Sequence, residues 1–396
     1  MERIHRGVVT LLRSAITGEK LQLADSFSLE EADALIKSQS LLPLVYRGAY
    51  LCGISPKTEL MQRYKQLYFQ HMMRSAQQMR ALELIYAAFE ANCIDYLPLK
   101  GSKLKGLYPQ PELRPMGDAD ILIRLEQYEK IKPLMLELGF KEDHESSYDL
   151  CWQSSALYVE LHKRMFGPNQ MDLCSYFGIG WERALPECGF LWTLSHEDEF
   201  VYIFSHMAKH FRFCGIGARQ IVDLYVYRKA YPEMDESKIE MTMAKLGLLE
   251  FYKNIRYLLR VWFEGEQSNP VCECITDFVF RSGNFGTTQN KLYAEELLKA
   301  NKSGTIRNAK WKSFWQMLFL PLSDMQLSYN ILYKCPILLP VFWVVRWFDV
   351  LINRRQNISR KLRIVREMND EKVETHRKLM EFMGLRYDYE VYENTK

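Results

Sequence analysis

The feature that most constrains the fold is a short apolar segment that carries two carboxylates. In the segment Gly117–Ile123, which reads GDADILI, acidic and apolar residues alternate before the sequence becomes fully apolar. Side chains of a strand point alternately to opposite faces of a sheet, so Asp118 and Asp120 share one face and Ala119 takes the other. The segment therefore predicts a strand with one face in a core and two acidic groups on the other. Neighbouring carboxylates on such a strand repel each other and are costly to bury, and a divalent cation between them removes that cost.

A second candidate strand supplies a third carboxylate. Glu160 lies in the run Leu157–His162, where it would share a face with His162. Three carboxylates can complete a two-metal site, in which cations held about 3.5–4 Å apart stabilise the attacking and leaving oxygens of a displacement. The expected cation is Mg²⁺, or Mn²⁺ in its place, because Mg²⁺ prefers oxygen ligands and keeps positions open for phosphate.

The residues before the acidic strand fit the binding of phosphate groups. Gly101 allows close approach of the backbone, and Gly101-Ser102 stands at the start of a predicted helix whose free N–H groups can cradle a phosphate. Lys100, Lys103 and Arg114 are nearby cations that could neutralise a triphosphate.

Helical patterns surround this α/β unit. We expect an N-terminal helical region over residues 1–92, the α/β unit over 93–190 and a C-terminal helical region over 191–396. Ser28 and Ser55-Pro56 are predicted helix starts, because Ser is a preferred N-cap and Pro fits the first helical position. The expected fold class is α+β, with a small mixed sheet that has helices on one side and is wrapped by the two helical regions.

The order of these motifs along the chain resembles that of a known family. Gly-Ser, then a strand bearing Asp-x-Asp, then a strand bearing an acidic residue, is similar to the pattern of DNA polymerase β-like nucleotidyltransferases. Over roughly residues 35 to 350, the sequence resembles the bacterial family usually labelled "uncharacterised nucleotidyltransferase". The stretches that resemble it are Leu99–Gly101, Tyr108-Pro109, Leu113–Pro115, Asp118–Leu122, Val159–His162, His206–His210, Arg219–Asp223 and Ser282–Gly286.

The resemblance implies a reaction and roles for the site residues. An acceptor nucleophile would attack the α-phosphate of an NTP and release pyrophosphate. Asp118 and Asp120 would bind metal, Glu160 would be the third acid, and Gly101 and Ser102 would hold the nucleotide phosphates. The acceptor stays open: a protein, an RNA or a small molecule. The alternative is a catalytically inactive module that binds a nucleotide or a partner, since fifteen residues separate Ser102 from Asp118, more than is usual in the superfamily.

Two histidines and an aspartate add candidates on the substrate side. His206 and His210 lie four residues apart and share a helix face, where they either pack or contact substrate. Met207 takes the place of the Glu that zinc proteases need after the first His, so a zinc site is not expected. Asp223 could orient one of these histidines or pair with Arg219, and His162 has the same ambiguity.

Charge and cysteine content bound the partners and the compartment. The net charge of +3 does not indicate a nucleic-acid partner, but residues 346–366 form a basic stripe that could dock RNA or touch a membrane. The apolar run at 336–348 is too short to span a bilayer, so we expect no transmembrane helix; a buried helix is favoured over a surface-seeking one. Nine cysteines, an odd number, fit free thiols in a reducing cytoplasm.

Overall fold

The structure of the protein is a computed structural model that describes residues 2–146, 148–167, 171–303, 319–322, 325, 329, 331–353 and 370–387. The chain forms two compact units. One comprises Met1–Phe211 and Gly215–Phe285, and the other comprises Arg212–Cys214 and Gly286–Lys396. The predicted three-part division of the chain, at residues 92 and 190, stays a prediction.

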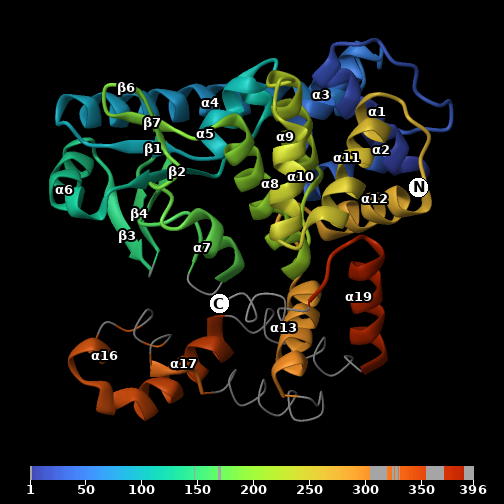
Figure 1. Cartoon of the computed structure of the whole chain (residues 1–396). Helices are drawn as coiled ribbons and strands as arrows, with labels where there is room; N and C mark the ends of the chain where they lie inside the picture. The colour runs from blue at the N-terminus through green and yellow to red at the C-terminus, as the bar shows by residue number, and fades with distance from the viewer. Residues whose placement is uncertain are drawn as a thin grey trace. The chain divides into compact units, whose positions relative to one another are not determined.

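The first unit is built from helices before and after a sheet (Figure 1). Before the sheet lie α1 (Arg3–Thr17), α2 (Leu29–Ser38), α3 (Leu42–Leu51) and the long α4 (Glu59–Ala91). Helices α5 (Gly101–Leu107), α6 (Tyr128–Glu137) and α7 (Met171–Phe177) connect strands, together with the 3-10 turns Pro111–Leu113 and Leu125–Gln127. After the sheet come α8 (His196–Phe213), α9 (Ala218–Ala230), α10 (Glu236–Lys245), α11 (Leu249–Phe263) and α12 (Pro270–Ser282).

The sheet is mixed and has the strand order β3-β4-β5-β2-β1-β7-β6. Its strands are β1 (Tyr96–Pro98), β2 (Asp118–Ile123), β3 (Lys141–Glu145), β4 (Asp149–Gln153), β5 (Tyr158–His162), β6 (Leu185–Cys188) and β7 (Leu191–Thr193). Strand β2 runs antiparallel to β1 and parallel to β5, so the strand with the two carboxylates lies inside the sheet. The expected α+β class with a mixed sheet is confirmed.

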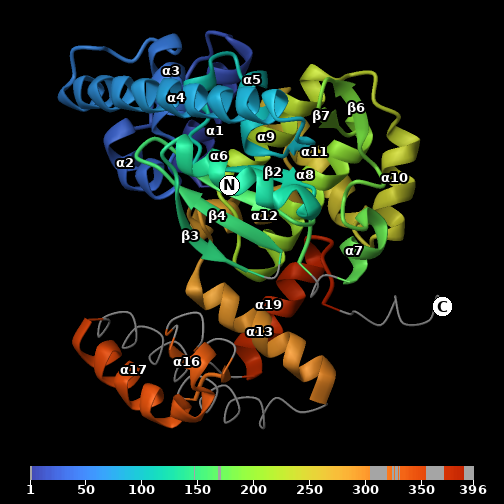
Figure 2. The same cartoon turned by 90° about the vertical axis from the view of Figure 1, so that its left-hand side faces the viewer.

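One face of the sheet forms the core against α4 and α6, which lie along it in both views (Figures 1 and 2). Ile121 and Ile123 of β2 are fully buried there, as the alternation of the strand requires. They pack in one cluster with Phe89 of α4 and Ile131 of α6. The opposite face is left to Asp118, Asp120 and their neighbours, so burial of one face sets the direction of the acidic groups on the other.

The helix starts were predicted with mixed success. Ser28 caps α2 by accepting a hydrogen bond from the backbone N–H of Glu31 at 3.2 Å, as expected. The prediction for Ser55-Pro56 is wrong, because α4 begins at Glu59 with Thr58 as its N-cap. The carbonyl of Ser55 instead accepts the N–H of Thr58 and closes a turn. Pro after Ser is common both in turns and at helix starts, so the dipeptide alone could not distinguish the two structures.

The second unit contains α13 (Thr288–Ser303), α16 (Ile331–Lys334), the 3-10 turn Pro336–Leu338, α17 (Leu339–Asn353) and α19 (Asp370–Phe382). The apolar run becomes α17, which is only partly buried: Trp343 and Trp347 pack on Phe319, whereas Val341 is 55% exposed. No helix among the described residues has the length and apolar character to cross a bilayer. Of the basic stripe, Arg346 lies on α17, and residues 354–366 lie outside the described residues. All nine cysteines are free.

Candidate active site

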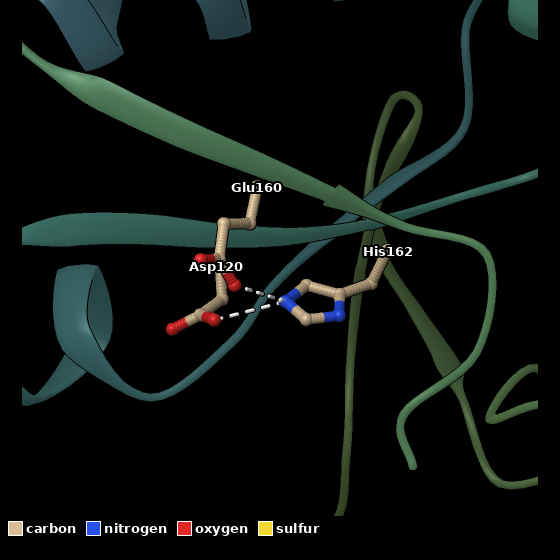
Figure 3. Close-up of side chains that lie close together, drawn as sticks. All are labelled: Asp120, Glu160 and His162. Atoms are coloured by element: carbon tan, nitrogen blue, oxygen red, sulfur yellow. Dashed lines mark hydrogen bonds and ion pairs between the residues drawn. The ribbon is translucent and has the colours of Figure 1, made fainter. Parts of the chain in front are cut away.

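The pairing of β2 with β5 places three polar side chains together. Asp120 is the register partner of Glu160, and Leu122 is the partner of His162. Figure 3 shows that the His162 ring points at both carboxylates, with Nε2 2.9 Å from Asp120 Oδ1 and 3.5 Å from Glu160 Oε2. One ligand atom from each of the three lies within 4.8 Å of the others, so the group could hold a cation.

Lys100 reaches the same carboxylate from the turn between β1 and α5. Its Nζ lies 3.2 Å from Asp120 Oδ1 and 3.1 Å from His206 Nε2. Burial and the Lys100 charge hold the pKa of His206 well below its ordinary value, so the ring is neutral and accepts a hydrogen bond from the ammonium. Lys100 has a φ of 31°, a backbone conformation that favours glycine. The side chain held in this conformation contacts both Asp120 and His206.

Neighbouring charges shift the pKa values of the acidic groups in opposite directions. Burial alone would raise the pKa of Asp120, but Lys100 and the hydrogen bond from His162 hold it well below its usual range. Despite burial, the hydrogen bonds to Asp120 and Glu160 raise the pKa of His162, which favours a ring that donates from Nε2. The enclosing cleft, with repulsion from Asp120 and Glu160, raises the pKa of Asp118 although its side chain remains open to solvent. A cation beside Asp118 would relieve this repulsion.

A cavity of about 270 Å³ opens beside Lys100, Asp118 and Asp120. Its walls come from the β1–α5 turn, β2, α8, the start of α9 and the loop after α12. The lining residues are Lys100, Gly101, Leu104, Arg114, Met116, Asp118, Asp120, Ile203, His206, Met207, His210, Gly215, Arg219, Gln220, Asp223, Asn284 and Phe285. The cavity thus joins segments that lie up to 185 positions apart in the sequence, from Lys100 to Phe285.

A buried ion pair forms one wall of the cavity. Arg114 donates from Nε to Asp223 Oδ1 at 2.7 Å and from Nη2 to Oδ2 at 2.9 Å, and the hydroxyl of Tyr108 donates to Asp223 Oδ1 at 2.7 Å. Arg114 Nη1 also donates to the carbonyl of Gly101 at 3.2 Å. The expected partners of Asp223, a histidine or Arg219, are therefore wrong. A planar guanidinium binds a carboxylate through two parallel hydrogen bonds. The positions of Arg114 and Asp223 along the sequence could not reveal this pairing.

Four of the six Asp, Lys and Arg side chains described in the cavity lining form ion pairs with each other, and two do not. Lys100 pairs with Asp120 and Arg114 with Asp223. Asp118 and Arg219 form no ion pair within the part of the chain that the structure describes. Among the described residues of the cavity, one carboxylate and one guanidinium are therefore without a direct ion pair.

The structure brings some predicted site residues to the cavity and leaves others beside it. Ser102 and Lys103 do not line it: the Ser102 hydroxyl donates to the carbonyl of Leu99 at 3.4 Å, and Lys103 Nζ bonds Thr193 and Glu199, both at 2.8 Å. Glu160 and His162 touch Asp120 but are not among the lining residues.

Sequence reasoning missed three polar residues of the lining, namely Arg219, Gln220 and Asn284. Each stood inside a stretch that resembled the family, and that was the available signal. His206 and His210 do line the cavity; burial and the charge of Lys209 lower the pKa of His210 to about 4, so both rings are neutral there at pH 7.

The donor set fits a divalent cation. Asp120 uses Oδ1 for both Lys100 and His162, and Oδ2 forms no recorded bond among the described residues. Asp118 has no cationic partner there either. Carboxylate oxygens of this kind are the ligands that Mg²⁺ prefers. Asp118 and Asp120 are thus the residues that would hold the ion, with Glu160 next to them.

The chain is similar in sequence to a known family. A family described as "Uncharacterised nucleotidyltransferase" matches residues 25–264. The chain belongs to this family. The match spans α4, the whole sheet and the cavity-forming helices α8 and α9, and it confirms the family expected from the sequence. No curated protein matches the chain. The solution structure of the antibiotic-resistance factor ANT(2'')-Ia is similar at 12% identity, covering 46% of this chain and 97% of that chain with a TM-score of 0.34.

Proposed function

We propose that the protein is a metal-dependent nucleotidyltransferase that moves an NMP from an NTP to an acceptor and releases pyrophosphate. The observation that supports this most is the pair of carboxylates Asp118 and Asp120, which line the cavity and have Glu160 beside them on the paired strand, in a chain of a nucleotidyltransferase family. In-line displacement at phosphorus needs charge neutralisation and positioning more than covalent chemistry from the protein.

The roles follow from the contacts. A divalent cation, Mg²⁺ or Mn²⁺, would supply the positive charge that neutralises phosphate oxygens when it is held by Asp118 and Asp120. Lys100 positions Asp120 and adds a second positive charge beside it. We assign Glu160, whose carboxylate lies 3.5 Å from His162 Nε2, the role of accepting the proton of an acceptor hydroxyl.

Gly101 lines the cavity and its carbonyl is bonded to Arg114, and we assign phosphate contact to the backbone at this turn. Ser102 and Lys103 are engaged elsewhere, so we assign them no direct phosphate contact. Within the cavity, the neutral rings of His206 and His210 face the acceptor side. The acceptor itself, whether protein, RNA or small molecule, is left to experiment.

The test is a transfer assay with α-³²P-labelled ATP, CTP, GTP and UTP, Mg²⁺ or Mn²⁺, and a cell extract as the source of acceptor. Label transfer and pyrophosphate release are followed for the wild type, Asp118→Asn and Glu160→Gln. Glu187→Gln is the matched control, because Glu187 is an exposed carboxylate on β6 of the same sheet.

The expected result is label on an acceptor with the wild type and with Glu187→Gln, and a loss of at least about a hundredfold with the two site variants, the size typical for removal of a general base or of a charge-stabilising group. Equal transfer by Asp118→Asn and wild type would refute the assignment. NTP binding without transfer for any nucleotide would instead support the inactive binding module.

A further inference from the structure

Arg219 stands out among the cations of the cavity because it lacks a carboxylate partner. Its Nη1 donates to the carbonyl of Pro115 at 2.9 Å, and its Nε is buried without a hydrogen-bond partner. Asp223 is the nearest candidate for an ion pair on the same helix, but both oxygens of Asp223 are bonded to Arg114. Burial and the neighbouring Arg114 charge lower the pKa of Arg219, and the attraction to Asp223 and Asp118 offsets this only in part.

The surroundings of Arg219 also suit an anion. Gln220 follows it in the first turn of α9, and Asn284 lies across the start of that helix, against Gly217. Neither amide side chain forms a hydrogen bond with the described residues, and one oxygen of each is buried without a partner. The NH₂ groups of both can therefore turn toward a ligand in the cavity that their side chains line.

A buried or partly buried guanidinium is costly without a counter-charge, and a carboxylate or phosphate compensates it best. Among the described residues, no carboxylate forms a direct ion pair with Arg219, and Asp223 is bonded to Arg114. The ligand must then bring the negative charge. Since the cavity holds Asp118 and Asp120 as well, the ligand that fits both is one whose anionic groups also carry a metal ion.

We infer that Arg219, assisted by the amides of Gln220 and Asn284, binds the triphosphate of the incoming NTP. This inference rests on the proposed function and names the group that binds the phosphates. It gives Arg219 the role that the sequence suggested for Arg114, whose guanidinium is committed to Asp223.

The interaction can be measured without any transfer reaction. Isothermal titration calorimetry with the full chain gives the affinity for inorganic tripolyphosphate and for each NTP, and for a nucleoside as a ligand without phosphates. Arg219→Gln removes the charge, and Arg219→Lys keeps it but loses the planar fork. Lys229→Gln is the matched control, an exposed cation on the same helix whose loss changes the net charge equally.

For Arg219→Gln we expect tripolyphosphate and NTP to bind roughly ten- to a hundredfold more weakly, the effect of one charged hydrogen-bonding group. Arg219→Lys should lose less, and Lys229→Gln should match the wild type. Nucleoside binding should not change in any variant. Thermal unfolding checks that Arg219→Gln is folded; if it is not, the comparison of Arg219→Lys with wild type decides.

Unchanged tripolyphosphate and NTP affinity in Arg219→Gln, or no tripolyphosphate binding by the wild type, would overturn the inference. A weakening of nucleoside binding equal to that of NTP would also overturn it, because Arg219 would then contact the base or sugar. The two proposals fail separately: Arg219-dependent anion binding without label transfer would reject only the transferase, and transfer with Arg219-independent NTP affinity would reject only the inference.

Discussion

Replacing Asp223 by Asn tests whether the buried ion pair holds the wall of the cavity. Asp223 is 4% exposed and Arg114 is 5% exposed, so neither charge is compensated by water. Asn keeps the shape and an acceptor for Tyr108 but leaves the guanidinium of Arg114 without a counter-charge. Removing one partner of a buried pair costs about 3–5 kcal/mol, and we expect the free energy of unfolding to fall by that amount at pH 7.

The loss should depend on pH in a predictable direction. Arg114 and Arg219 hold the pKa of Asp223 below the ordinary 3.8 against the opposing effect of burial. A carboxyl whose pKa is lower in the folded state contributes stability above its unfolded pKa and loses it as the pH falls through the folded one. The difference between wild type and Asp223→Asn should thus be complete at pH 7 and shrink below about pH 4.

Urea unfolding of the full chain, followed by circular dichroism, measures the effect. Glu142→Gln is the control, because the pair that it breaks with Lys132 is 40% and 44% exposed and should contribute less than about 1 kcal/mol. A double-mutant cycle with Arg114→Met isolates the coupling energy. A loss for Asp223→Asn no larger than that for Glu142→Gln would refute the claim that this pair stabilises the wall.

Two backbone predictions can be checked by the same unfolding measurement. Lys100→Gly and Lys100→Ala both remove the ammonium, but only Gly relieves the strain of a φ of 31°, which is worth about 1–3 kcal/mol. Gly also costs about 0.4–1 kcal/mol through the greater freedom of the unfolded chain, and the Gly variant should be the more stable of the two by the difference. Equal stability of the two variants would show that the backbone is not strained. Gly48→Ala should destabilise by about 1–3 kcal/mol, because its Cβ would lie 2.0 Å from the carbonyl oxygen of Leu11 where α3 crosses α1, whereas Gly106→Ala in α5 meets nothing within 4 Å and should be neutral or stabilising.

The acidic strand could be predicted from sequence because its information is local. Alternation over the residues of β2 fixes which side chains share a face, and Glu160 follows from the same rule on β5. The hairpin of β3 and β4 was not predicted. Strand β3 reads KEDHE and is exposed along its whole length at the edge of the sheet, so it has no apolar alternation to detect.

The cavity wall could not be predicted, because its contacts join distant positions. Arg114 and Asp223 are 109 residues apart, and no spacing rule links them. Sequence alone offered Lys100, Lys103 and Arg114 as equal candidates for phosphate. The fold separates them: Lys103 is held by Glu199 and Arg114 by Asp223. Arg219, which the sequence offered only as part of a family-like stretch, has no ion pair among the described residues.

Asp118 and Arg219, the two charged groups of the cavity that lack a direct ion pair among the described residues, imply that metal and nucleotide bind cooperatively. A cation at Asp118 and a triphosphate near Arg219 would each neutralise one charge and would also attract each other, so each should bind more tightly in the presence of the other. By linkage the two gains are equal. We expect Mn²⁺, titrated by electron paramagnetic resonance, to bind about tenfold more tightly with a non-hydrolysable NTP analogue, a coupling of about 1.4 kcal/mol. The same factor should appear in the affinity for the analogue and should approach one in Asp118→Asn. Independent binding in the wild type would show that the two ligands do not share this cavity.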